Sequence, residues 1–126
     1  MRLPPWMYEY LAGIRPDPSA PGYRRIVLKP VPLAGIDFVR AWRQTMAGRI
    51  ESRWYRSKGK LAWEISIPAG ATATVYFPTT DPARITECGK PAANVTGMRF
   101  LRQDGDTVVY EVESGRYSFR LINELQ

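Results

Sequence analysis

The stretch that decides the fold runs from Arg49 to Phe77 and reads RIESRWYRSKGKLAWEISIPAGATATVYF. Its middle part alternates apolar and polar residues with a period of two, as in a strand with one buried and one solvent-exposed face. Turn signals at Lys58-Gly59 and at 68–70 divide the stretch into three consecutive antiparallel strands. The residues predicted to face the core are Ile50 and Trp54 on the first strand, Leu61, Trp63, Ile65 and Ile67 on the second, and Ala71, Ala73, Val75 and Phe77 on the third.

Short segments of the same kind lie on both sides of this stretch. We expect strands at 24–29, 37–46, 84–87, 98–101, 107–112 and 116–122, each followed by a turn signal. Pro30 and Pro32 follow the first of these strands, which suggests an edge position in its sheet. The pattern of about nine short strands predicts an all-β fold, an antiparallel β-sandwich of the jelly-roll or Greek-key type.

The N-terminal residues differ in character from the rest of the chain. Residues 6–13, WMYEYLAG, predict the end of a short helix with Gly13 as its C-terminal cap. So short a helix is unstable alone, so its apolar side chains need a partner surface. The residues predicted for this domain interface are Trp6, Tyr10, Leu11 and Ile14.

Three prolines and a glycine at 15–23 predict a semi-rigid linker after this helix. We therefore divide the chain into a helix end at 1–14, the linker at 15–23, and a β-sandwich domain at 24–126.

Length and composition are those of one globular domain. The chain has 126 residues, of which 44% are hydrophobic and 24% charged. No apolar run is long enough to span a bilayer, and the N-terminus has no signal-peptide core, so we expect no membrane partner and a cytoplasmic location for the chain as expressed. The net charge is +6, but the basic residues are spread along the strands, with Arg24-Arg25 as the longest run, which argues against nucleic acid as a partner.

Few residues could carry catalysis. The chain has no histidine, which removes histidine-based triads, the usual general base and the commonest metal ligand. Cys88 is the single cysteine, and we expect a small, half-buried side chain at a strand end. Glu51 and Glu64 lie on adjacent predicted strands, where neighbouring arginines account for them. We predict no catalytic residue, no metal site and no cofactor.

The aromatic residues leave two interpretations open. Exposed rings on a sheet could stack on sugars, and the candidates for such contacts are Tyr55, Trp54 and Trp42. Alternatively, Trp54 and Trp63 point into the core with the alternating aliphatic residues. Tyr55 points away from Trp54, so it is the first candidate for an exposed ring.

Several motifs follow one another in the order found in one known family. Residues 6–30 read WMYEYLAGIRPDPSAPGYRRIVLKP, and later motifs are GRIESRW at 48–54, IPAGATATVYFP at 67–78, ECGKP at 87–91 and GRYSF at 115–119. Together they resemble the end of the last catalytic-barrel helix and the C-terminal β-sandwich of bacterial α-L-rhamnosidases, glycoside hydrolase family 78.

The resemblance implies a non-catalytic accessory domain. In that family the catalytic carboxylates lie in an (α/α)₆ barrel, so no catalytic residue is carried over to this chain. The implied partner is a catalytic barrel, and the parent enzyme would remove terminal α-L-rhamnose from glycosides or polysaccharides. Without that barrel, we expect the apolar N-terminal segment to favour a homodimer. The alternative is a carbohydrate-binding sandwich that uses exposed aromatic residues.

Overall fold

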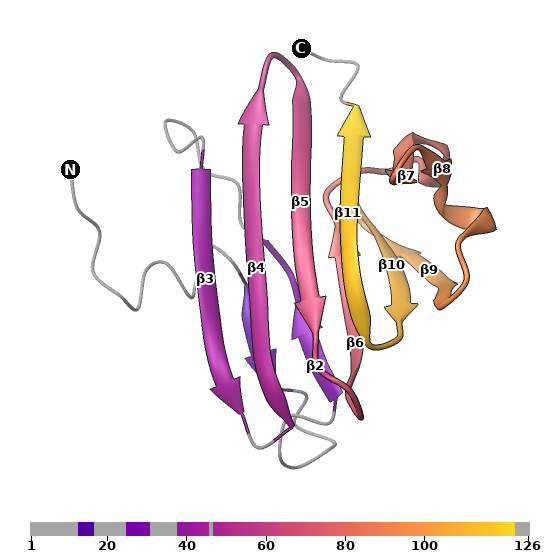
Figure 1. Ribbon diagram of the computed structural model, residues 1–126. Coiled ribbons are helices and arrows are strands. Elements are labelled where there is room, and N and C mark those ends of the chain that lie inside the picture. The colour runs from indigo at the N-terminus through magenta and orange to yellow at the C-terminus, as the bar shows by residue number, and fades with distance from the viewer. Residues whose placement is uncertain (1–12, 17–24, 31–37, 46, 123–126) are drawn as a thin grey trace.

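Two β-sheets face each other in the computed structural model, which describes residues 13–16, 25–30, 38–45 and 47–122 (Figure 1). The five-stranded sheet has the order β1-β2-β6-β10-β9, and the six-stranded sheet has the order β3-β4-β5-β11-β7-β8. The strands are β1 (Ile14–Pro16), β2 (Arg25–Leu28), β3 (Phe38–Thr45), β4 (Gly48–Ser57), β5 (Lys60–Ile67), β6 (Thr72–Phe77), β7 (Ile85–Glu87), β8 (Lys90–Pro91), β9 (Met98–Asp104), β10 (Thr107–Val112) and β11 (Gly115–Ile122).

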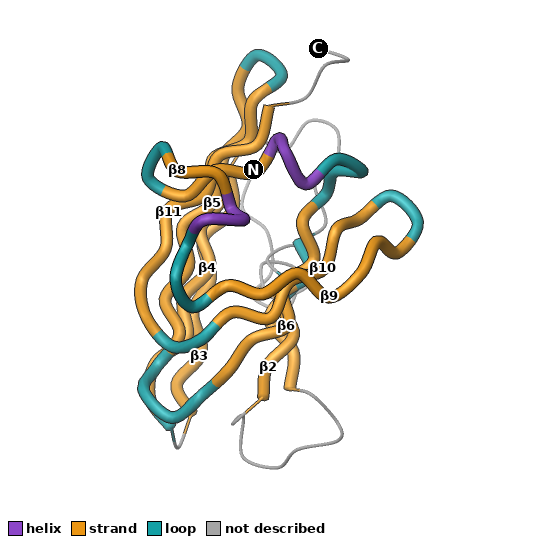
Figure 2. Tube along the Cα trace, turned by 90° about the vertical axis from the view of Figure 1, so that its right-hand side faces the viewer, coloured by secondary structure: helices purple, strands orange, loops and turns teal. Residues whose placement is uncertain are grey.

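The two layers are seen edge-on in Figure 2, and they confirm the predicted all-β sandwich. Helical residues in the described ranges are confined to two 3₁₀ turns, η2 (Pro82–Arg84) and η3 (Ala92–Asn94). Among these residues, none belongs to a helix long and apolar enough to cross a membrane. The predicted helix at 6–12 lies outside the described residues.

The stretch from Arg49 to Phe77 supplies three strands, but they do not form one continuous meander. β4 and β5 pair antiparallel through the Lys58-Gly59 turn. β6 instead crosses to the five-stranded sheet, where it pairs parallel to β2 and antiparallel to β10. The turn at 68–70 is therefore a corner between the two layers. Alternation identified the buried face of each strand correctly, but it carries no information on which layer a strand joins.

Aromatic side chains from both sheets meet in the core. Phe77 of β6 makes edge-to-face contacts with Trp63 of β5, Phe119 of β11 and Tyr110 of β10, with ring centroids 5.5, 4.8 and 5.7 Å away. Each such pair stabilises the folded state by about 0.5 to 1.5 kcal/mol beyond the contribution of the apolar surface that the two rings bury. Apart from Leu61, which is partly buried against the core, the residues predicted to face inward on β4, β5 and β6 are all buried.

One buried hydrogen bond ties β4 to β5 within this core. The indole Nε1 of Trp63 donates to the hydroxyl of Ser52 at 2.9 Å, and both residues are fully buried. Ser52 breaks the apolar face of β4 between Ile50 and Trp54, and this bond explains why a polar residue is tolerated there.

The N-terminal part of the sandwich corrects three predictions. Ile14 is only 5% exposed and pairs with Leu28, so it belongs to the core of this chain and not to a domain interface. Residues 14–16 form the edge strand β1 and are not the start of a linker; Pro16 fits there because an edge strand tolerates a missing N–H. β2 lies between β1 and β6 and not at an edge. The sequence allows this interior position because Pro30 and Pro32 follow the strand and remove none of its own N–H groups.

Ser52→Ala tests the buried hydrogen bond. The substitution leaves the Trp63 N–H buried without an acceptor, so we expect the free energy of unfolding to fall by about 1 to 3 kcal/mol. Urea denaturation followed by tryptophan fluorescence measures the change. The matched control is Ser66→Ala on β5, where the serine faces outward and the loss should be small. Equal losses in the two variants would contradict the importance of this bond.

Candidate functional site

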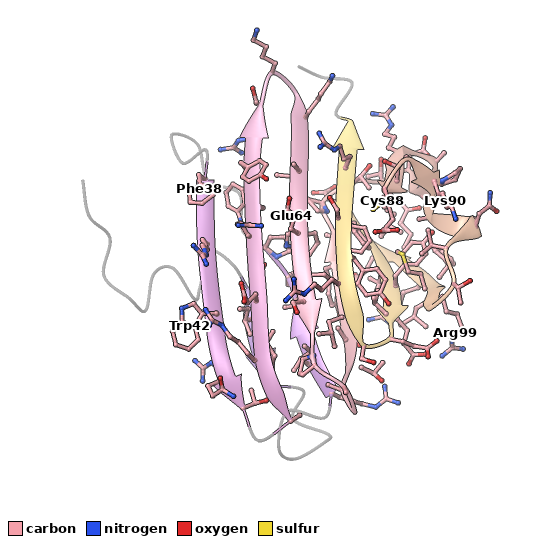
Figure 3. All side chains as sticks on the ribbon, in the orientation of Figure 1. Phe38, Trp42, Glu64, Cys88, Lys90 and Arg99 are labelled. Atoms are coloured by element: carbon pink, nitrogen blue, oxygen red, sulfur yellow. The ribbon has the colours of Figure 1, made fainter. Side chains whose placement is uncertain are left out.

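The outer face of the six-stranded sheet carries exposed aromatic rings beside charged side chains. Strand register places the outward residues of β3, β4, β5 and β11 in three rows that run across the strands. The rows are Phe38, Tyr55, Ala62 and Arg120; Arg40, Arg53, Glu64 and Ser118; and Trp42, Glu51, Ser66 and Arg116. Figure 3 looks onto this surface, which we call the outer face, with Phe38 and Trp42 on β3 and Glu64 on β5.

Exposed aromatic rings lie at the β3–β4 side of the outer face. Phe38 and Trp42 are 53% and 52% exposed, and Tyr55 is 39% exposed. The rings of Phe38 and Tyr55 are nearly parallel, with centroids 5.8 Å apart, and the guanidinium of Arg49 lies 4.2 Å from the Trp42 ring centroid. Two of the three predicted sugar-contacting residues therefore share one surface, and sequence reasoning missed Phe38, although its alternation with Val39 on β3 placed it there.

Trp54, the third predicted sugar-contacting residue, is fully buried. It lies opposite Trp63 in the β4–β5 pair, on the inner side of the sheet. The prediction that Trp54 contacts carbohydrate is therefore wrong, and the alternative core position is correct.

Glu64 is held at the centre of the outer face by two neighbours. One carboxylate oxygen pairs with Arg53, and the other accepts a hydrogen bond from the Tyr55 hydroxyl at 3.2 Å. The hydrogen bond from Arg53 holds the pKa of this carboxyl below its usual value. Glu64 is therefore a charged hydrogen-bond acceptor at neutral pH and is poorly suited to donate a proton. Glu51 pairs with Arg49 at 3.3 Å, as the sequence predicted for both carboxylates.

A hollow of about 350 Å³ opens beside Glu64, between β4, β5, β11 and the end of β7. Its polar lining includes the guanidinium groups of Arg53 and Arg116, the carboxylates of Glu51, Glu64 and Glu87, and the hydroxyls of Ser66 and Ser118. A second hollow, of about 740 Å³, lies at the other end of these strands. Tyr55, Lys60 and Arg120 line it together with residues next to η2.

Cys88 is exposed in the turn between β7 and β8, which corrects the prediction of a half-buried side chain. Its backbone has a positive φ of 50°, so the turn carries the side chain outward. The thiol donates to the Glu87 carboxylate at 3.1 Å, and this contact raises the pKa of the thiol. Cys88 is therefore mostly protonated at neutral pH and a poor nucleophile. No group of three or more potential metal ligands occurs among the residues that the structure describes.

The remaining predicted interface residues, Trp6, Tyr10 and Leu11, lie outside the described residues. Lys29 N donates to Gly13 O at 3.0 Å, and Ile14 continues into β1.

The two packed sheets place the described part of the chain in the class of all-β sandwich domains. The model of the bacterial α-L-rhamnosidase C-terminal domain matches residues 13–91. This chain belongs to that family, and it corresponds to the non-catalytic C-terminal domain of those enzymes.

Relatives extend the match to nearly the whole chain. An α-L-rhamnosidase of Streptomyces avermitilis is 32% identical over 90% of this chain and 10% of its own length. The crystal structure of that enzyme complexed with L-rhamnose gives a TM-score of 0.76 over 92% of this chain and 10% of the other, at 31% identity. An α-L-rhamnosidase of Formosa agariphila is 25% identical over 91% of this chain and 12% of its own length.

An α-L-rhamnosidase from Dictyoglumus thermophilum shares the fold with a TM-score of 0.78 at 24% identity, over 94% of this chain and 13% of that one. The chain thus spans about a tenth of the length of the curated relatives that it matches.

Glu64 should make the stability of the sandwich depend on pH. A carboxyl whose pKa is lowered by folding stabilises the folded state above its unfolded pKa, and this contribution is lost as the pH falls through the folded pKa. We expect Glu64→Gln to lower the free energy of unfolding by about 0.2 to 1 kcal/mol at neutral pH, the range for exposed ion pairs. The difference from the wild type should vanish in strong acid, where the carboxyl is protonated.

Urea denaturation at a series of pH values measures this difference. The control is Glu113→Gln, because Glu113 is an exposed carboxylate with no basic side chain within 4 Å in the described part of the chain. A destabilisation by Glu64→Gln that persisted unchanged into strong acid would contradict the role of the Arg53 ion pair.

Proposed function

We propose that this chain braces the catalytic domain of a larger α-L-rhamnosidase-like glycoside hydrolase. The parent enzyme would hydrolyse terminal α-L-rhamnose from glycosides or polysaccharides, and the sandwich would contribute stability and shape without taking part in bond cleavage. The observation that carries the proposal is the match over nine-tenths of this chain to one-tenth of enzymes named α-L-rhamnosidase.

The chemistry of the outer face supports a non-catalytic role. Glycoside hydrolysis by the usual route needs one carboxyl that is protonated and one that is charged. Glu64 is kept charged by Arg53 and Tyr55, and Glu51 is paired with Arg49. Each carboxylate thus has a structural partner that accounts for it.

The backbone at Gly13 supports a fixed junction with whatever precedes it. Gly13 has a φ of +72°, and a Cβ built there would lie 1.8 Å from the carbonyl oxygen of Lys29. The chain therefore enters β1 pressed against the end of β2, and the approach leaves no room for a side chain. We propose that Trp6, Tyr10 and Leu11, just upstream of this contact, pack against the catalytic domain.

The same apolar segment would be uncovered in the isolated chain. We propose that it then promotes homodimers, because exposed apolar patches of this kind favour association. Light scattering after size-exclusion chromatography, with and without Trp6→Ala, measures this tendency.

A chimera tests the bracing role. The matched C-terminal segment of the Streptomyces avermitilis enzyme is replaced by this chain, and the product is compared with the intact enzyme and with an enzyme lacking the segment. We expect the chimera to cleave p-nitrophenyl α-L-rhamnoside and to melt within a few degrees of the intact enzyme. The deletion enzyme should melt lower or aggregate, because its catalytic domain loses a packed surface.

Two further proteins sharpen this experiment. Trp6→Ala with Leu11→Ala in the chimera should lower the melting temperature while the folded fraction keeps its kcat. The purified 126-residue chain, shown to be folded by circular dichroism, should not cleave the substrate. A chimera no more stable than the deletion enzyme, or cleavage by the chain alone, would overturn the proposal.

A further inference from the structure

We propose that the outer face of the six-stranded sheet binds an anionic polysaccharide. Aromatic rings on β3 and β4 would stack on sugar rings, and guanidinium groups on β3 and β11 would pair with carboxylate or sulfate groups of the same polymer. The proposal rests on the function proposed above in one respect, namely that the ligand is a sugar.

The aromatic rings are placed as platforms for a chain of sugars. Phe38 and Trp42 lie on the same side of β3, four residues apart, which is about 13 Å along a strand. They are thus too far apart to contact one sugar ring and suit separate units of one polymer. Contacts already present, Tyr55 beside Phe38 and Arg49 over Trp42, hold both rings in place before a ligand arrives.

The charges of the outer face favour an anion. Its described basic residues are Arg40, Arg49, Arg53, Lys60, Arg116 and Arg120, and its carboxylates are Glu51 and Glu64, with Glu87 of β7 as a third in the hollow. Arg49 pairs with Glu51, and Arg53 pairs with Glu64. The other four cations have no carboxylate within 4 Å in the described part of the chain. They therefore give the face a positive potential that a neutral sugar would not use.

The row formed by Trp42, Glu51, Ser66 and Arg116 contains both a ring for stacking and a guanidinium for ion pairing. It begins at the Trp42 ring, passes Glu51 and Ser66, and ends at Arg116 on β11, about 14 Å across four strands. Arg116 and Ser66 also line the hollow of about 350 Å³ beside Glu64, where Glu51, Glu64 and Glu87 supply acceptors for sugar hydroxyls. A short stretch of polysaccharide can thus cross the strands with one ring on Trp42 and an acidic group beside Arg116.

The two carboxylates help to distinguish a polysaccharide from a nucleic acid. Glu51 and Glu64 accept hydrogen bonds, and sugar hydroxyls supply donors along the whole polymer. A nucleic acid backbone offers at most one hydroxyl on each unit, so it would leave these acceptors largely without donors. The mixture of acceptors, free cations and exposed rings therefore fits a hydroxyl-rich anion best.

Affinity electrophoresis of the 126-residue chain tests the proposal. The gels contain polygalacturonate, dextran sulfate, neutral dextran or polyuridylate. We expect polygalacturonate or dextran sulfate to slow the protein, with the first indicating carboxylate and the second sulfate recognition. Neutral dextran and polyuridylate should have less effect. Trp42→Ala and Arg116→Ala should each weaken binding about tenfold, the loss expected for a charged hydrogen bond or a stacked ring.

The opposite sheet offers matched controls. Arg99→Ala and Phe100→Ala remove an exposed arginine and a 49% exposed ring from β9, and they should leave the binding unchanged. Circular dichroism establishes that every variant is folded. Equal losses in the β9 variants, stronger retardation by polyuridylate, or no retardation by either acidic polymer would each overturn the proposal.

This test is separate from that of the bracing role. If the chimera is as stable as the intact enzyme but neither acidic polymer slows the 126-residue chain, the bracing role stands and only the polysaccharide site is overturned. A chimera that loses the binding shown by the isolated chain would indicate that the catalytic domain covers the outer face, and this too would overturn the site.

Discussion

The edge-to-face packing of Phe77 between Trp63 and Phe119 is the contact on which the sandwich depends. Phe77 comes from one sheet and its two partners from the other, so these rings fix the distance and the register between the layers. The hydrogen bond from Trp63 to Ser52 then fixes the orientation of the indole and joins β5 to β4. Because Glu64 follows Trp63 on β5, the same anchoring sets the position of the carboxylate at the centre of the outer face.

The two outer surfaces of the sandwich differ in how their charges are satisfied. On the five-stranded sheet, Glu111 accepts from Arg99 at 2.8 Å and from Arg25 at 3.4 Å, and Arg102 donates to the Tyr76 hydroxyl at 3.0 Å. Arg102 and Tyr76 flank Val109 in the strand register, and Val109 is fully buried. Side chains of the same sheet therefore cover the apolar residue on this surface. The six-stranded sheet leaves rings and cations available. That asymmetry is why we assign ligand contacts to one surface only.

The sequence was sufficient to predict nine of the described strands, the buried faces of β4, β5 and β6, and the family, because each rests on a local pattern. It missed the two short strands β1 and β8. The alternation around Trp63 and the turn at Lys58-Gly59 needed no long-range information. The crossing of β6 into the other sheet was missed because its partners, β2 and β10, are distant in sequence. The sequence left two positions open for Trp54, in the core or on the surface, because exposure depends on what packs above a residue. Cys88 was misjudged, because an outward turn there depends on its positive φ. The hollow beside Arg116 joins residues of β4, β5, β7 and β11 and has no local signature.

The position of β11 between β5 and β7 has a consequence for how the domain forms during translation. The strand occupies an interior place in its sheet, yet it is encoded by 115–122, after every other strand that the structure describes. β7 and β8 can pair with each other, but they have no connection to β5 and the rest of the six-stranded sheet until these residues have left the ribosome. A nascent chain that stalls before this point would carry a split sheet with open edges, which is a hazard for aggregation. Completion of the layer is thus a late event in the synthesis of the domain.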